Sequence, residues 1–329
     1  MASPFFSLQF IDAVQRARGD VEVAVLRDAE RIVGFWPLHR IGGVAKPVGR
    51  FLNDAHNVVS SPNLQIDWRF LLKRCGVRGF DFHALVGDTS IVPDEMIRGV
   101  QESFAADLRG GGAASLRRME ASHRTMKKQD QKTRKMQREL GPLRLEFDCR
   151  DESVLQTAID WKRQQYTRTH ILDLFTLPWT RTFLSSLHGL DPAEDCRGVV
   201  SALWAGDELV ATHIGMLQCN LLHYWFPAYN VDHAIYSPGT ALFKSIVAAS
   251  DSIGIDKIDM GYGAIPYKRK QTDVVTTVAK GCVTYSRWLR GQRALSSWVQ
   301  QAAPRVPMKE TVKRVVRSVV PNAGVGKIR

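Results

Sequence analysis

The sequence Tyr236-Ser-Pro-Gly-Thr-Ala241 stands between a predicted strand, Leu221–Tyr229, and a predicted helix, Thr240–Ser252, and it decides the expected fold. Proline and glycine at a strand-to-helix turn open the N-terminus of the helix and leave its amide N–H groups free. Free amides at that end are what binding a phosphate requires. The turn is therefore a candidate cradle for a pyrophosphate group, and an ordinary turn with proline in the first helical turn fits the same residues.

The strand predicted upstream of this turn, Leu209–Leu217, is apolar on both faces, which is typical of a central strand. Because side chains alternate along a strand, His213 and Gly215 share one face with Ala211. A glycine within a strand lets another backbone or a ligand approach closely. We therefore expect the candidate site to extend along this strand.

The order of predicted elements differs from a repeating strand–helix–strand series and indicates an α+β fold. Helices come first, followed by a meander of strands and then a strand–helix–strand crossover. The predicted helices are Pro4–Arg16, Glu152–His170, Pro178–Leu187 and Thr240–Ser252. The predicted strands are Val21–Arg27, Ile32–Arg40, Gly198–Ala205, Leu209–Cys219, Leu221–Tyr229, Lys257–Met260 and Val274–Tyr285.

A weak internal repeat relates the two halves of the chain at an offset of about 177 residues without gaps. The segment Val23–Gly34 lines up with Val200–Ala211, and each predicts a strand, a polar turn and a strand. Upstream, Phe6 aligns with Phe183, each within a predicted helix. Duplication of one domain accounts for this pattern, and the general likeness of valine-rich hairpins is the alternative.

The net charge of +12 is concentrated in two segments. Nine basic and three acidic residues lie between Ser115 and Leu140, which follows Gly110-Gly-Gly and ends at Gly141-Pro142, so one basic helix is predicted there. This helix is either a solvated surface helix or a helix that binds phosphates. Ten basic residues and one acidic residue follow from Arg287 to Arg329. The valines of this tail have helical spacing, which is typical of an interfacial amphipathic helix or of packing on its own domain: Val312, Val315, Val316 and Val319.

Composition excludes several classes of protein. With 329 residues, 44% of them apolar, the chain is long enough for about two folded domains. The five cysteines are scattered without a C-x-x-C pair, so neither a disulfide framework nor a zinc cluster is expected. No apolar run approaches the length of a membrane span, and the N-terminus lacks the pattern of a secretion signal. We expect a cytoplasmic protein without a metal.

The turn resembles the acyl-coenzyme A signature of GNAT acyltransferases, Q/R-x-x-G-x-G/A, with Tyr236 in place of the first residue.

The resemblance implies acyl transfer, which from a thioester to an amine needs a neutral amine, donors for the developing oxyanion and an acid for the leaving thiolate. His213 is a candidate to take the proton or to orient the acceptor, and Asp259 to hold the acceptor. Tyr267, before Tyr262, is the candidate acid, and Lys268 suits a phosphate or a carboxylate. A buried structural histidine, a capping aspartate, a packed tyrosine and a solvated lysine are the respective alternatives.

The turn is one of several segments that resemble this superfamily. Together with Ser3-Pro-Phe-Phe, Trp161-Lys-Arg-Gln-Gln-Tyr166, Asp259-Met-Gly-Tyr-Gly263 and Tyr267-Lys268, it is similar to the FemAB-like branch, particularly the acetyltransferase domain found with cellulose and exopolysaccharide biosynthesis genes. The resemblance spans residues 3–288. It implies that acetyl-CoA or another acyl-CoA is held by Tyr236, Ser237, Pro238, Gly239, Thr240 and Ala241.

The resemblance implies tandem GNAT-like domains, each with a mixed, mostly antiparallel sheet flanked by helices. The expected division is an N-terminal domain at 1–112, a basic connecting helix at 113–141, an acyl-CoA-binding domain at 142–290 and a basic tail at 291–329. The implied function is N-acylation of an amine on a sugar nucleotide or glycan precursor in polysaccharide biosynthesis. Two alternatives stay open, namely an aminoacyltransferase that uses aminoacyl-tRNA and a basic module that binds membrane or nucleic acid. Outside the tRNA alternative no nucleic acid is expected, and the basic tail predicts peripheral contact with anionic membrane.

Overall fold

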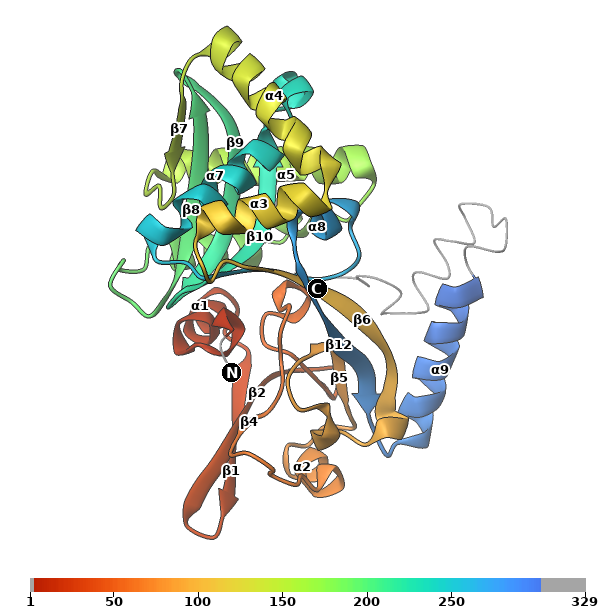
Figure 1. Cartoon of the computed structure of the whole chain (residues 1–329). Coiled ribbons are helices and arrows are strands. Elements are labelled where there is room, and N and C mark those ends of the chain that lie inside the picture. Colours follow the sequence, from red (N-terminus) through yellow and green to blue (C-terminus); the bar gives the residue numbers. More distant parts are fainter. Residues whose placement is uncertain (1–2, 303–329) are drawn as a thin grey trace. The chain divides into compact units, whose positions relative to one another are not determined.

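The computed structural model describes residues 3–302, with side chains to residue 294, and divides the chain into two compact units (Figure 1). Unit 1 comprises residues up to 19 together with 101–278, and unit 2 comprises 20–100 together with the residues from 279. Strands β6 (Ile97–Asp107) and β12 (Val274–Val283) each contribute residues to both units. The domain boundaries expected at 112, 141 and 290 stay a prediction.

Unit 1 is built on a mixed sheet with the strand order β6-β11-β10-β9-β8-β7. Every neighbouring pair in it is antiparallel except β10 and β11, which are parallel. Besides β6, the strands are β7 (Leu143–Glu146), β8 (Cys196–Ala205), β9 (Glu208–Gln218), β10 (Leu221–Tyr229) and β11 (Lys257–Tyr262). As expected from its apolar faces, β9 is an interior strand.

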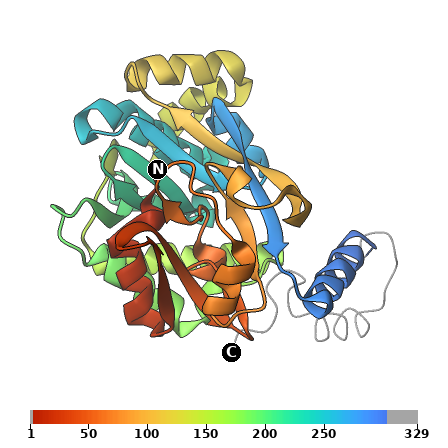
Figure 2. The same ribbon diagram turned by 90° about the horizontal axis from the view of Figure 1, so that it is seen from below.

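Helices cover both faces of this sheet. Figure 2 shows the yellow helices α3 and α4 on one side of the strands and the lime-green helix α5 on the other. Tyr224 of β10 belongs to the hydrophobic core formed with α3, α4 and α7, whereas its neighbour His223 contacts Phe5 of the N-terminal segment. The helical elements are η1 (Pro4–Phe6), α1 (Leu8–Arg18), α3 (Gly112–Ser122), α4 (Arg124–Leu140), α5 (Glu152–Thr169), η5 (Leu174–Thr176), α6 (Pro178–His188), η6 (Val231–Tyr236), α7 (Pro238–Ile253) and α8 (Pro266–Gln271).

Unit 2 repeats this architecture on a smaller scale, with the strand order β1-β2-β3-β5-β12 and a short β4 beside β2. The β3–β5 pair is parallel and the other pairs are antiparallel. Its elements are β1 (Val21–Asp28), β2 (Arg31–Ile41), β3 (Val44–Lys46), η2 (Arg50–Leu52), β4 (Val59–Ser60), α2 (Trp68–Arg74), β5 (Phe80–Leu85), η3 (Thr89–Ile91), η4 (Asp94–Met96), β12 and α9 (Arg287–Ala302).

The expected α+β class, with mixed and mostly antiparallel sheets flanked by helices, is confirmed. Each predicted helix and strand has a counterpart, with ends shifted by a few residues. Among helices within residues 3–302, none has both the length and the apolarity needed to cross a bilayer. The valine-containing segment predicted at Val312–Val319 lies outside the described residues.

The two hairpins of the sequence repeat agree in structural detail. In the β1–β2 hairpin Asp28 pairs with Arg31, and in the β8–β9 hairpin Ala205 pairs with Glu208, at the same offset. Both hairpins shift register at the equivalent step, after Leu26 and after Leu203. The first turn residues are equivalent as well, because Ala29 and Gly206 both have left-handed backbone angles, with φ of 49° and 57°. Shared register, bulge and turn are what a duplicated hairpin retains.

The basic segment forms two helices instead of the single helix predicted for Ser115–Leu140. His123 interrupts it with extended backbone angles, φ −136° and ψ 104°, between α3 and α4. The interruption lets both helices contact α7. Their methionines Met119, Met126 and Met136 are buried in the unit 1 core.

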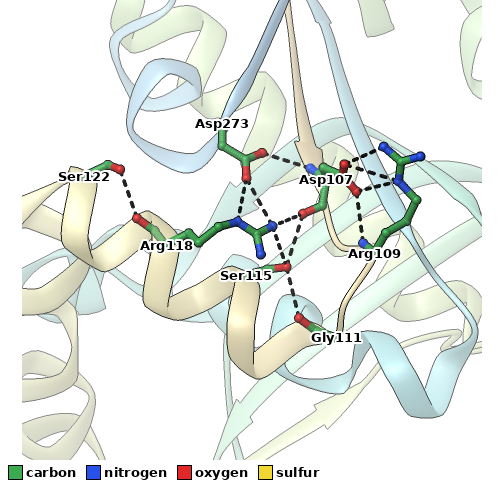
Figure 3. Close-up of polar contacts among 7 residues, drawn as sticks. All are labelled: Asp107, Arg109, Gly111, Ser115, Arg118, Ser122 and Asp273. Carbon is green, nitrogen blue, oxygen red and sulfur yellow. Dashed lines mark hydrogen bonds and ion pairs between the residues drawn. The ribbon is translucent and has the colours of Figure 1, made fainter.

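A polar network fixes the start of α3 (Figure 3). It includes Asp107, at the end of β6, and Asp273, just before β12. The Arg118 guanidinium donates to the Asp107 carbonyl at 2.6 Å and to the Asp273 carboxylate at 3.3 Å. The other Asp273 oxygen accepts the Asp107 amide at 2.9 Å. Ser115 Oγ donates to the Gly111 carbonyl within the first turn. These contacts join α3 to the ends of β6 and β12 and thereby set where α4 begins.

Gly112 should be intolerant of any side chain, because a Cβ atom there would lie 2.0 Å from the Val247 carbonyl oxygen and 2.7 Å from Ser250 Oγ of α7. We expect Gly112→Ala to lower the free energy of unfolding by about 2–4 kcal/mol, since α3 must move away from α7. Urea unfolding followed by circular dichroism measures this. Gly291→Ala is the control, because a Cβ atom at Gly291 meets nothing within 4 Å. Equal stability of the two variants would contradict the close packing.

Candidate functional site

The parallel strands β10 and β11 stay paired over only three residue pairs and then separate. The last pair is His223 with Asp259, although β10 continues to Tyr229 and β11 to Tyr262. Beyond that pair, the facing backbone groups of the two strands have no strand-to-strand hydrogen bonds. The separation opens a gap in the sheet where a ligand's own polar groups can bond to the backbone.

His223 and Asp259 form a polar pair at the point where the strands separate. Nδ1 of His223 lies 3.5 Å from Oδ2 of Asp259, and Oδ1 accepts the Gly261 amide at 2.9 Å. Burial raises the pKa of Asp259, but hydrogen bonding and charge from His223 outweigh it and leave the pKa below its ordinary value. The His223 side chain is fully buried, whereas the Asp259 side chain is 20% exposed. Asp259 is therefore the member of the pair that an acceptor can reach.

Aromatic side chains enclose the buried side of the pair. The Phe5 ring packs edge-on against His223, with centroids 4.8 Å apart, and against Trp225 at 5.5 Å. The rings of Trp225 and Phe226, at the register shift of β10, stack with their centroids 4.7 Å apart. The N-terminal segment that the sequence singled out thus covers the histidine and holds it against Asp259.

The turn predicted to hold the donor begins α7. Ser237 is its N-cap in a left-handed conformation, φ 53° and ψ 55°. The amides of Thr240 and Ala241 donate to the Ser237 carbonyl at 3.0 and 3.2 Å, so they are engaged, contrary to the expectation of free amides throughout the turn. Pro238 has no N–H, which makes Gly239 the first amide of the helix.

Gly239 stands in open space beside that amide. A Cβ atom there would meet only Tyr229, at 3.7 Å, and the backbone angle is within the ordinary range for any residue. The glycine is therefore not required by packing within unit 1. A backbone approach by a ligand is the remaining physical reason for a bare backbone at this turn.

Helix α4 lies directly beside the turn. Gln129 donates to the Tyr236 carbonyl at 2.9 Å, and Lys132 Nζ donates to Ser237 Oγ at 2.8 Å. Lys135 lies over the Tyr236 ring at 5.9 Å, and the Tyr236 hydroxyl donates to Glu139 at 2.5 Å. The basic helix thus places lysine ammonium groups next to the first turn of α7. A positive helix end with adjacent lysines fits the phosphates of coenzyme A.

His213 is buried in the sheet and away from Asp259. Its ring stacks on Tyr224 with centroids 4.1 Å apart, and its Nδ1 lies 3.3 Å from Ser201 Oγ. Because the Ser201 hydroxyl donates to the Phe147 carbonyl, Nδ1 is the protonated nitrogen of a neutral ring. Burial, with the nearby charges of His223 and Lys162, lowers the pKa of His213 to about 3. Its Nε2 has no hydrogen-bond partner.

Gly215 is explained by the same packing. A Cβ atom there would lie 2.3 Å from the His223 carbonyl oxygen and 2.5 Å from the His213 ring. The close approach predicted from this glycine is therefore made by the neighbouring strand and by the His213 ring of β9 itself.

The burial of neutral His213 predicts a pH-dependent stability. An unfolded histidine binds a proton below about pH 6.5, whereas the folded one stays neutral down to about pH 3. The fold therefore loses stability as the pH falls through this window, by about 2 kcal/mol between pH 7.5 and pH 5 from this residue. His56 and His83 are also buried with lowered pKa values, so each of them adds to the loss of stability at low pH.

The measurement is urea unfolding of the wild type and of His213→Phe at both pH values, because phenylalanine keeps the ring under Tyr224. The pH-dependent loss in the variant should be smaller by about 2 kcal/mol. An equal loss in both proteins would show that His213 is not buried as a neutral ring.

The remaining predicted residues, Tyr267 and Lys268, lie on a short helix that the sequence did not predict, α8. Tyr267 packs against the unit 1 core, on the side that holds Tyr224. Lys268 is buried and donates to the Tyr262 carbonyl at 2.7 Å. The structure thus places Tyr267 and Lys268 close to the separated end of β11, in the same region as Asp259 and apart from Ser237.

Sequence reasoning assigned no role to three functional candidates, namely His223, Phe5 and Lys162, although Phe5 and Lys162 lie in segments that carry the family resemblance. Lys162 occupies an inward position of α5 and is only 8% exposed. The spacing of Val154, Ala158 and Lys162 places them on one face of a helix, which could have predicted that Lys162 is buried. A lysine in a charged stretch is more often expected to be exposed to solvent.

One hollow in the surface of unit 1 does not coincide with these residues. It has a volume of about 590 Å³ and lies between α5 and α6. Its wall contains a single charged side chain and no group that the chemistry above requires, so it is not taken as the site. Its lining residues are Gln156, Ile159, Arg181, Thr182, Ser185 and Ser186. Within the described part of the chain, no cluster of histidine, cysteine or acidic residues could hold a metal ion.

Comparison with known proteins gives one family match. Residues 123–269 match the family model described as an acetyltransferase (GNAT) domain. No curated protein matches the sequence.

Among solved structures, FemX is similar with a TM-score of 0.58 and 9% identity, over 87% of this chain and 93% of the other. The C-terminal domain of a putative lysylphosphatidylglycerol synthetase from Agrobacterium fabrum is similar with a TM-score of 0.52 and 15% identity, over 88% and 91%. A conserved protein of unknown function from Bacteroides thetaiotaomicron is similar with a TM-score of 0.53 and 10% identity, over 84% of this chain and 90% of the other. Residues 123–269 are thus similar to the acetyltransferase (GNAT) domain, and the chain shares the fold of these solved structures.

Proposed function

We propose that this protein transfers an acyl group from acyl-CoA to an amine. The observation that carries the proposal is the separation of β10 and β11 next to an open helix N-terminus. The first turn of α7, with Lys132 beside it, supplies a place for the donor's phosphates. The gap beyond His223 and Asp259 supplies backbone groups that can bond to an extended donor chain.

The two faces of the sheet divide the chemical roles. Asp259 holds the acceptor amine from the face that Phe5 and α5 cover, and the proton released by the attacking amine passes to the Asp259–His223 pair. His223 is fixed for this role by Phe5, and its positive charge after protonation is balanced by Asp259. On the other face, the Tyr267 hydroxyl is the proposed acid for the leaving thiolate.

For the acceptor we propose an amine of a sugar nucleotide or glycan precursor, as in the polysaccharide-associated acetyltransferases that the sequence resembles. The corresponding setting is the cytoplasm, with the basic tail contacting anionic membrane. Acetyl is the proposed acyl group.

Calorimetric titration of the protein with acetyl-CoA tests the donor, and release of the coenzyme A thiol with a panel of amino sugars and amino-sugar nucleotides tests the reaction. We expect saturable donor binding and thiol release that depends on the amine. Absence of binding by acetyl-CoA and by longer acyl-CoA species would overturn the proposal.

A second candidate, aminoacyl transfer from aminoacyl-tRNA, is favoured by one feature of α4. Its seven basic side chains are all exposed, and its two acidic residues already contact Lys244, Lys135 and Tyr236. A row of exposed cations is suited to a phosphate backbone. Binding of charged tRNA whose affinity falls steeply with salt, without acyl-CoA binding, would select this function. The exposed basic residues of α4 are Arg124, Lys127, Lys128, Lys132, Arg134, Lys135 and Arg138.

A further inference from the structure

Lys162 is a buried cation that the donor chemistry does not use. It projects from α5, is 8% exposed, and donates from Nζ to the Pro227 carbonyl of β10 at 3.0 Å. The Tyr166 ring lies 5.5 Å from the ammonium group. Within residues 3–294, Lys162 forms no ion pair with a carboxylate. A carbonyl oxygen and an aromatic face compensate only part of the cost of burying a full charge.

Lys268 brings a second ammonium group to the same opening. It is 6% exposed and donates to the Tyr262 carbonyl at 2.7 Å and to the Gly261 carbonyl at 3.4 Å. The carbonyls that the two lysines bond to therefore come from β10 and from β11, in both cases beyond the last strand pair. Lysines from α5 and α8 thus face the gap from its two sides.

The two cations repel one another. Burial, and then the charge of Lys268, lower the pKa of Lys162 to about 8. The charge of Lys162 in turn contributes to the low pKa of His213 on β9. Two like charges out of water, with no acid beside Lys162, repel one another in the interior of unit 1. An anion there would offset this repulsion and give the Lys162 ammonium a charged hydrogen-bond acceptor.

We propose that Lys162 and Lys268 bind an anionic group of the acceptor substrate, a carboxylate or a phosphate, at the opening between β10 and β11. The identification of the ligand as the acceptor rests on the proposed function, because the donor's phosphates have their own place at the first turn of α7, beside Lys132. Lys162 lies on α5, which covers the face of the sheet where Asp259 is reached. The acceptor would thus be held by its anion at the lysines and by its amine at Asp259.

The test uses the full chain and two anions that do not titrate near pH 8, sulfate as a stand-in for a phosphate and acetate for a carboxylate. Calorimetry near pH 8, in two buffers with different ionisation enthalpies, gives both affinity and proton uptake. An anion at Lys162 raises its pKa, so about half a proton should be taken up for each anion bound. Preference for sulfate or for acetate tells which anionic group the acceptor carries.

Two variants locate the anion. Lys162→Met should weaken binding at least about 10-fold and abolish the proton uptake, because methionine keeps the shape of the side chain without its charge. Lys73→Met removes an exposed lysine of α2 in unit 2 and should leave both the affinity and the proton uptake unchanged. Lys162→Arg is the second variant that keeps the proposal testable if methionine disturbs the fold, and it should retain binding without proton uptake, since arginine stays protonated.

Binding that is lost in Lys132→Met and kept in Lys162→Met would place the anion at α7 and overturn the proposal, as would the absence of any sulfate or acetate binding to the folded wild type. Titration with acetyl-CoA in parallel separates the two ideas. Sulfate or acetate binding that depends on Lys162, in a protein that does not bind acyl-CoA, would overturn the proposed function and leave the anion site standing.

Discussion

Asp259→Asn should lower kcat/KM for amine acylation by about 10²–10⁴-fold while leaving the affinity for acetyl-CoA unchanged. Asparagine keeps the shape of the side chain and can still accept the Gly261 amide. It removes the negative charge that balances His223 and that holds the acceptor amine. The measurement is thiol release with the amine that reacts fastest, beside calorimetry with acetyl-CoA.

Asp28→Asn is the matched control, because Asp28 is an exposed carboxylate of β1 in unit 2. Its kcat/KM should equal that of the wild type. His223→Gln should behave like Asp259→Asn, since the two residues act as one pair. If Asp259→Asn retained full kcat/KM, the proton would have to leave by another route, and the pair at the head of the gap would be structural.

The second large effect is expected at the donor turn, where Gly239→Glu should weaken acetyl-CoA binding at least about 100-fold. The glutamate places a negative charge and five extra heavy atoms where the phosphates would meet the first amide of α7. The turn itself should be preserved, because a Cβ atom at Gly239 meets only Tyr229, at an ordinary contact distance of 3.7 Å.

Two comparisons make this result specific. Gly239→Ala adds the Cβ atom without the charge and should lose much less affinity than the glutamate variant. The urea midpoint of both variants should match that of the wild type. Unchanged acetyl-CoA binding by Gly239→Glu would show that the donor is held elsewhere.

The sequence was sufficient for features that depend on local periodicity. The strand with two apolar faces became the interior strand β9, and the proline and glycine of the turn stand at the start of α7, so both of these predictions are confirmed. The break at His123 was missed because nothing in the local sequence requires it. It is the packing of α3 and α4 on a third helix that bends the segment.

The composition of the candidate site depends on contacts between distant residues, which local patterns do not report. His223 meets Asp259 only because two parallel strands, joined through α7, have a particular register. Phe5 reaches His223 from the other end of the sequence. His213 drew attention as a polar residue in an apolar strand, but its partners Ser201 and Tyr224 make it part of the core.

The matching hairpins have a consequence for how the two halves of the chain have diverged. At the offset of the repeat, Trp36 of β2 occupies the place of His213, and Leu38 occupies the place of Gly215. Trp36 is 1% exposed and packs edge-on against Phe80 in the unit 2 core. The polar and bare positions of one copy are thus filled by large apolar side chains in the other. The hairpin of unit 2 therefore serves its own hydrophobic core. The hairpin of unit 1 has instead a buried imidazole and a bare backbone position, beside the strands that separate.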